Sequence, residues 1–460
     1  MRTFLNRPGC WLLALGLLLA LPRGSAAQAF SSGSTGADGP FNPTSNMTLT
    51  LPPNGVFNFT TINIPSGVTV RFLRNAANTP VILLATGNVV LNGLLDVSGS
   101  TAGQYGRPGA GGPGGYDGGI GADGITTATG SVGLGPGGGG GGPAGNGSGG
   151  GGSYATAGAA GGGGGGATYG GVTLRPIVGG SGGGGGGGAL GSTIGGGGGG
   201  GGGAILIASS TSITIHSVDY YNRAQTVIQA NGGNGTAGVP GMSAGAGGAG
   251  SGGAIRLIAP TITGTSVLDA RGGSSYDIGA GRVRLEASNL AFTGSSNPLA
   301  ATGYLQPVFP AAGQPRLAIA SAAGIAAPEA PRGTFLDPPD ILLPAGTTNP
   351  IEVVLTAGNM PLGTVIQVMA APQSGGRVTA TSTGLAGSVA SSTATASLSL
   401  NLSQTSILTA TATYALVAGA GEGPLYAEGE EVTHVTVAAV FGGASTVTYL
   451  TRSGREVQVQ

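Results

Sequence analysis

Residues 99–203 contain more glycine than any other residue type, and they include the uninterrupted runs Gly161–Gly166, Gly182–Gly188 and Gly195–Gly203. Glycine has no side chain to bury, it loses more backbone entropy on ordering than other residues, and it supplies no acid, base or nucleophile. A chain of 460 residues with 100 glycines is therefore not built mainly for side-chain chemistry. The segment favours a structural or surface protein over an enzyme.

The first 29 residues have the pattern of an export signal. Arg2 and Arg7 precede the apolar run Trp11–Leu21, and the small residues Ala27 and Ala29 offer cleavage sites. The run is too short to cross a bilayer as a stable helix, and no later run is long enough for a membrane span. We expect cleavage after Ala27 or Ala29, and a bacterial protein that is secreted or held at the cell surface.

Composition excludes several classes of site. Cleavage of the signal would remove the only cysteine, Cys10, so no thiolate ligand, disulfide or cysteine nucleophile would be left. Charged residues make up only 7% of the chain, and the two signs balance. Nucleic-acid binding requires a strongly positive surface, which such a chain lacks. We expect no nucleic-acid partner and no cofactor; the expected partners are extracellular glycans or components of the cell surface or matrix.

An internal repeat is the strongest folding signal. Each unit has a strand that ends near alanine, a middle element, a second strand and then Gly-Gly. The copies begin at Val81–Ala85, Ala204–Ala208, Ala254–Ala259 and, in degenerate form, Arg282–Ala287. One unit cannot bury its own apolar face, so the copies must stack. The repeat predicts a short right-handed parallel β-helix over residues 30–297.

The glycine-rich segments 99–203 and 232–253 both leave this repeat after the second strand, which predicts insertions on one face of the β-helix. They could form a flexible coil. They could also form three-fold polyglycine helices packed side by side through backbone hydrogen bonds. The nearly charge-free runs, with large residues such as Tyr154 and Leu174 spaced among them, favour packed order. Stacking would also align Ala85, Ala208, Ala259 and Ala287 at one corner.

The C-terminal part of the chain has a different pattern. Residues 298–339 are rich in proline and alanine, which indicates a linker, although Leu317–Ile325 could supply a first strand. From residue 340 to 460, short strand signals recur at regular spacing with Gly, Pro and Asn between them. This pattern is typical of an antiparallel β-sandwich, here immunoglobulin-like. The expected fold class is all-β.

Charged residues at equivalent repeat positions are the candidate catalytic or binding groups. Asp96, Gln229 and Asp269 share one position, and Arg256 and Arg284 share another. Stacked coils would turn them into an outward polar stripe that could touch a sugar polymer, with carboxylates for proton transfer or calcium binding. The simpler interpretation is that these residues alternate with core residues and face water. We favour the simpler interpretation, because Gln229 interrupts the carboxylates and lysine is absent.

A second candidate is the acidic patch of Glu428, Glu430 and Glu431 near His434. Calcium would need several oxygens converging on one point, and the spacing is more typical of a solvated hairpin loop. His216 alternates with apolar neighbours, as His434 does, which indicates strand-surface positions for both. We expect no metal site here, with these glutamates as the only weak candidates.

The opening strands, the Gly-Gly-x-Ile-x-Leu-x-Ala repeat and the glycine-rich insertions resemble exported bacterial glycine-rich β-helix surface or adhesin-like proteins. The glycine runs also resemble those of phage tail-fibre adhesins in composition. The resemblance implies a non-enzymatic protein that presents a glycine-rich, low-charge contact surface, with no catalytic residue carried over. The alternative is a carbohydrate-binding or polysaccharide-cleaving β-helix that uses Asp269, Arg256 and Arg284.

Overall fold

The computed structural model describes residues 30–458 apart from 127, 192, 218, 220–222, 240–243, 274–278, 310–313, 329–330, 332, 417–424, 428 and 440–444. The predicted export signal lies outside the described residues. The described residues form strands and no helix, so the expected all-β class is confirmed. None of their segments is a helix long and apolar enough to cross a membrane.

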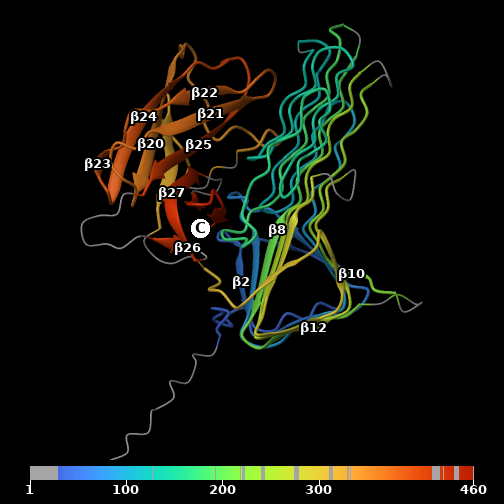
Figure 1. The fold of residues 1–460 in the computed structure, drawn as a ribbon. Coiled ribbons are helices and arrows are strands. Elements are labelled where there is room, and N and C mark those ends of the chain that lie inside the picture. Colours follow the sequence, from blue (N-terminus) through green and yellow to red (C-terminus); the bar gives the residue numbers. More distant parts are fainter. Residues whose placement is uncertain are drawn as a thin grey trace, which may run out of the picture.

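The N-terminal half is a parallel β-helix of three sheets (Figure 1). The first sheet contains β1 (Met47–Thr50), β4 (Thr69–Leu73), β7 (Leu94–Asp96), β10 (Thr226–Gln229), β13 (Val267–Asp269) and β16 (Ser295–Asn297). The second contains β2 (Val56–Phe59), β5 (Val81–Ala85), β8 (Ala204–Ser209), β11 (Ala254–Ile258), β14 (Arg282–Glu286) and β17 (Ala301–Gly303). The third contains β3 (Ile62–Ile64), β6 (Val89–Leu91), β9 (Ser212–Ile215), β12 (Thr261–Gly264) and β15 (Asn289–Phe292). Each coil visits the second, third and first sheets in turn.

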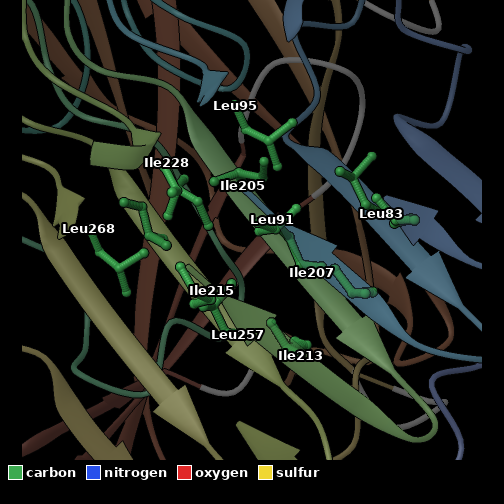
Figure 2. Packing of buried hydrophobic residues seen from close by; sticks show 14 of the residues in the cluster. Leu83, Leu91, Leu95, Ile205, Ile207, Ile213, Ile215, Ile228, Leu257 and Leu268 are labelled. Carbon is green, nitrogen blue, oxygen red and sulfur yellow. The ribbon is translucent and has the colours of Figure 1, made fainter. Parts of the chain in front are cut away.

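The three sheets enclose one apolar core (Figure 2). Side chains alternate along each strand, so Leu83, Ile207 and Leu257 of the second sheet point inward in register with one another. Each fully buried leucine or isoleucine contributes about 1.5–3 kcal/mol relative to an exposed one. Stacking therefore completes the core that no single coil could build.

The expected alanine ladder is wrong at one position. Ala208 pairs with Leu84 and Ile258, whereas Ala85 pairs with Ser209. The reason is that Ile207 must lie opposite Leu83 to reach the core, and this register moves Ala208 by one residue.

Each described glycine-rich insertion joins the first sheet to the second. Residues 97–203 connect β7 to β8, and residues 230–253 connect β10 to β11, so both leave at the same corner of the β-helix. We call these two segments together the glycine lattice. They rise from the β-helix as extended chains lying side by side, drawn in teal to green in Figure 1. The insertions are packed, as predicted, but their chains are not β-strands, because their hydrogen bonds follow another pattern.

Hydrogen bonds in the lattice recur every third residue. The amides of Gly182, Gly185 and Gly188 donate to Leu134, Ser131 and Ala128 of one neighbouring chain. Those of Gly183 and Gly186 donate to Gly199 and Gly196 of a second, and those of Gly184 and Gly187 donate to Gly150 and Gly147 of a third. All of these N–O distances are 2.7–3.0 Å. Three neighbours around one chain match the geometry of a polyproline II helix, which has three residues per turn and no internal hydrogen bonds. Each of these seven amides is satisfied by an adjacent chain, as a dry interior requires.

Close backbone approach explains why these positions are glycine. A Cβ atom added at Gly183, Gly186 or Gly198 would lie only 2.0–2.2 Å from a carbonyl oxygen of an adjacent chain. No side chain can occupy that space. The lattice is therefore a core made of backbone, and its composition follows from its geometry.

The C-terminal part is a β-sandwich of two antiparallel sheets. One sheet contains β19 (Ile325–Ala326), β18 (Arg316–Ala322), β20 (Ile351–Gly358), β24 (Ser391–Leu398) and β23 (Ala386–Ser388). The other contains β22 (Val378–Thr381), β21 (Ile366–Pro372), β25 (Ser406–Ala415), β27 (Glu430–Ala439), β28 (Ser445–Thr451) and β29 (Glu456–Gln458), and β26 (Tyr426–Ala427) pairs with β27. The expected order, a parallel β-helix followed by an antiparallel sandwich, is confirmed.

Two differences concern the segment between the two parts. The β-helix continues past residue 297 through β17. The first strand of the sandwich that the sequence offered at Leu317–Ile325 does form, as β18, and it pairs with β20. Ile341–Leu343, the first apolar stretch in the region 340–460 where the sequence predicts short strands, does not form a strand. The segment rich in proline and alanine therefore contains β17 of the β-helix near its start and β18 of the sandwich further on.

The sandwich lies against the glycine lattice (Figure 1). Ile407 of β25 packs in one cluster with Tyr116 and Leu134 of the lattice. Nearby, the Arg377 guanidinium donates to the Gly138 carbonyl oxygen at 3.2 Å, and the Thr334 hydroxyl bonds to Asp117. Burial lowers the pKa of Arg377. These contacts join the two parts directly.

Candidate functional site

Arg256 and Arg284 point outward from the second sheet but are not accessible. They pair with each other across β11 and β14, and their neighbours Ile255 and Leu257 face the core. Arg256 is only 1% exposed. Its guanidinium donates to both carboxylate oxygens of Glu286, at 3.3 and 3.0 Å, and Arg284 bonds to the same carboxylate. We call Arg175, Arg256, Arg284 and Glu286 the arginine cluster.

Chain segments from elsewhere cover this cluster. Arg284 donates to the carbonyl oxygen of Val172 in the lattice, and Arg256 donates to that of Pro307, both at 3.4 Å. Desolvation lowers the pKa of Arg256, while the Glu286 carboxylate opposes that shift. The predicted solvent-facing stripe is therefore wrong for Arg256 and Arg284. The sequence pattern showed their outward register, but it did not show that the insertion folds back over them.

The other predicted positions form a separate ladder on the first sheet. Arg71, Asp96, Gln229, Asp269 and Asn297 align across β4, β7, β10, β13 and β16. Asp269 and Arg256 thus lie in different sheets and do not form one stripe. The shared position of Asp96, Gln229 and Asp269 is confirmed. The expectation that these residues face water is wrong for Asp269, which is only 3% exposed because Asn231 and Arg271 bind its carboxylate.

Asp269 lies beside a polar groove of about 340 Å³. The side chains of Ser98, Thr101, Gln229, Asn231, Asn234 and Arg271 line it. Asp269 Oδ2 accepts from Asn231 Nδ2 at 3.0 Å and pairs with Arg271 at 2.8 Å, while the buried Oδ1 has no hydrogen-bond partner among the described residues. The groove offers amide donors and acceptors in close proximity, which suits a hydroxyl-rich ligand.

The acidic patch forms a hairpin with its own counterions. Glu430 and Glu431 begin β27, and Glu428 lies outside the described residues. Glu431 pairs with Arg452 at 3.0 Å, and Glu430 accepts from the Ser453 hydroxyl, which is the main cause of its lowered pKa. Within the described ranges, no group of three or more His, Cys, Asp or Glu side chains could hold a metal ion.

His216 directly follows the end of β9, and His434 is an exposed residue of β27. His216 Nδ1 is 3.1 Å from the Thr265 hydroxyl oxygen, and His434 Nδ1 is 3.1 Å from that of Thr433. Both contacts are exposed. The structure does not bring either ring to Asp269 or to the arginine cluster.

Large apolar side chains are exposed where the lattice chains turn. Tyr105 is 66% exposed, Ile125 82% and Leu190 61%. Glycines with positive φ, Gly124 and Gly191, close the second and third of these turns. We call Tyr105, Ile125 and Leu190 the distal tip.

Backbone contacts bring the three turns together. Gly191 donates to the Gly124 carbonyl oxygen at 2.6 Å, and Gly121 donates to that of Gly106 at 2.9 Å. The Asp123 carboxylate accepts from the amides of Ile125 and Thr126, which shapes the middle turn. From Gly203 at the β-helix to Gly195 below the tip, eight residues span about 25 Å. The distal tip is thus an ordered surface held away from the β-helix.

The distal tip has a signal of its own in the sequence, separate from the strand repeat. Each tip residue is a single large apolar side chain beside a glycine and within a short break between glycine-rich stretches. Such isolated residues cannot enter a lattice without space for Cβ atoms, so they must lie at its turns or edges. The sequence prediction also missed Glu286, the partner of the arginines, although it lies two residues from Arg284 on the same strand face.

Comparison of the chain with protein-family models, with curated protein sequences and with solved structures gives no match. The geometry of the tip, the groove and the arginine cluster is therefore the basis on which a function can be inferred.

Proposed function

We propose that this chain is an exported, non-enzymatic, adhesin-like protein of a bacterial surface, in which the glycine lattice is a stiff arm that presents the distal tip. The observation that carries this proposal is the exposure of Tyr105, Ile125 and Leu190 on turns that backbone hydrogen bonds hold together. The C-terminal sandwich, which we propose is immunoglobulin-like, acts as a spacer or attachment module. The expected partners are extracellular glycans or cell-surface or matrix components.

Physical reasons support a contact role for the tip. Grouped apolar side chains on a surface mark interaction sites more often than scattered ones do. The lattice fixes the turns before contact, so binding costs less conformational entropy than it would with flexible loops. Its low charge also makes contact insensitive to salt.

The test is binding of the labelled full chain to intact bacterial and animal cells and to immobilised matrix proteins. We expect the variant Tyr105→Ser/Ile125→Ser/Leu190→Ser to lose at least tenfold in affinity. The matched control, Leu342→Ser/Val389→Ser/Leu402→Ser, changes three exposed apolar residues of the sandwich region and should bind like the wild type. Equal binding by the tip variant, or no binding by the wild type to any of these surfaces, would refute the proposal.

A second candidate function is glycan binding at the groove beside Asp269. The amide-rich lining favours it, and the separation of Asp269 from Arg256 limits the proposal to binding without cleavage. On a glycan array, the full chain should bind at least one oligosaccharide, and Gln229→Ala/Asn234→Ala should weaken that signal at least fivefold. A wild-type signal equal to background would exclude this function.

A further inference from the structure

An apolar cavity lies where the main parts of the molecule meet. Its volume is about 260 Å³. The second sheet contributes Ile82 and Leu206, the lattice contributes Leu174 and Ile177, and Val308 and Phe309 close it from the segment that follows the β-helix. Ser445 and Thr446 of the sandwich complete the wall. This volume is slightly below the range for sites that hold drug-sized molecules, about 300–1,000 Å³, so the cavity suits a smaller ligand.

The cavity also has a guanidinium group without a carboxylate partner in the described part of the chain. Arg175 lines the cavity, and its described hydrogen bond is to Gln306 Oε1, a neutral amide oxygen, at 3.4 Å. Arg256 lines it too, but Glu286 already binds Arg256.

The arginine cluster therefore has an excess of positive charge. Glu286, which is fully buried, is the carboxylate that Arg256 and Arg284 share, and Arg175 adds a third cation near them. Positive charge in a partly dry environment is unfavourable unless an anion compensates it. The site combines apolar walls with one guanidinium that is free to bind an incoming anion.

We propose that this cavity binds an amphipathic monoanion, a medium-chain carboxylate with its carboxylate on Arg175 and its alkyl tail along Ile82, Leu174 and Phe309. A planar guanidinium binds a carboxylate through two parallel hydrogen bonds, which favours this head group. Of the two arginines that line the cavity, Arg256 is already bound by Glu286, so the open position is the guanidinium of Arg175, which one carboxylate fills. The walls favour a linear apolar tail over a sugar or a nucleotide. This inference does not depend on the function proposed for the distal tip.

The test is isothermal titration of the full chain with octanoate. We expect saturable one-to-one binding, and at least tenfold weaker binding of 1-octanol, which has the same tail without the charge. From hexanoate to octanoate, each added methylene should tighten binding about three- to fourfold. Equal affinity for octanoate and 1-octanol, or no heat of octanoate binding above that of acetate, would overturn the proposal without any variant.

Substitution of the guanidinium locates the site. Arg175→Gln should weaken octanoate binding at least tenfold and leave 1-octanol binding unchanged. Arg71→Gln is the matched control, because Arg71 is exposed on the first sheet and pairs with Asp96. Octanoate binding by Arg175→Gln at wild-type affinity would contradict the assignment of Arg175. If Arg175→Gln does not fold, the comparison of octanoate with 1-octanol on the wild type decides the question.

Discussion

At the scale of single residues, the lattice positions require glycine because glycine has no Cβ atom. Gly198 donates to the Gly119 carbonyl oxygen at 2.8 Å, and a Cβ at Gly198 would lie 2.0 Å from the Gly183 carbonyl oxygen. The position needs its amide and has no room for any side chain. An ordinary core tolerates many apolar residues of similar volume, whereas this one tolerates a single residue type.

We predict that Gly198→Ala destabilises the protein by about 2–3 kcal/mol, because adjacent backbone must move to admit the methyl group. Gly376→Ala is the control, since no atom lies within 4 Å of the place its methyl group would take and its φ is not positive. The control should change the free energy of unfolding by less than about 0.5 kcal/mol. Urea unfolding of both variants measures this difference, and similar losses would argue against the lattice.

Glu286 is a second residue with a large expected effect. Glu286→Gln would leave Arg256 and Arg284 buried without a counterion, which costs about 3–5 kcal/mol. Glu352→Gln, on an exposed position of β20, is the matched control and should have little effect. Thermal unfolding should show a large drop in Tm for the first variant alone. A small drop for Glu286→Gln would mean that water reaches these arginines.

At the scale of elements, the strands of the β-helix could be predicted from the sequence. The segments that cover the outer face of its second sheet could not. The repeat placed Ile205, Ile255 and Val283 at equivalent positions, because apolar alternation and stacking are local and periodic. It could not show that Val172 and Pro307 cover Arg284 and Arg256, because those contacts join segments distant in sequence. The tip residues were visible as isolated apolar residues, but only the turns and hydrogen bonds of the lattice bring them together.

The lattice order leads to a prediction for amide exchange. Interior amides such as Gly183, Gly186 and Gly199 donate to adjacent chains and are buried, so they should exchange at least a thousandfold more slowly than an unstructured glycine peptide. The exposed segment 159–162 at the edge should exchange faster than these interior positions. Hydrogen exchange followed by mass spectrometry measures both. Uniform, immediate exchange across residues 99–203 would show a flexible coil instead.

At the scale of the whole molecule, the sandwich and the lattice are coupled by direct contact. Ile407 belongs to the cluster with Tyr116 and Leu134 and not to the sandwich core, so its role is to join the two parts. The Arg377 and Thr334 contacts act at the same junction. Coupled parts unfold together when their interface is large enough.

We predict that calorimetry of the wild type shows one unfolding transition and that Ile407→Ser separates it into two. Leu402→Ser, a nearby exposed position of the sandwich, is the control and should keep one transition. Two transitions in the wild type, or one unchanged transition in Ile407→Ser, would show that this junction does not couple the parts.

The three-residue period of the lattice hydrogen bonds has a consequence for how such a chain can change its reach. If three residues were added to an outgoing chain and three to the chain that returns beside it, every later amide would still point at the same neighbouring chain. Each such pair of insertions would move the turn outward by about 9 Å and leave the β-helix untouched. An insertion of one or two residues would rotate every later amide away from its acceptor. The length of the glycine lattice can therefore change in fixed steps. A gene that gains or loses three codons in each of two adjacent chains changes this length and leaves the β-helix as it was.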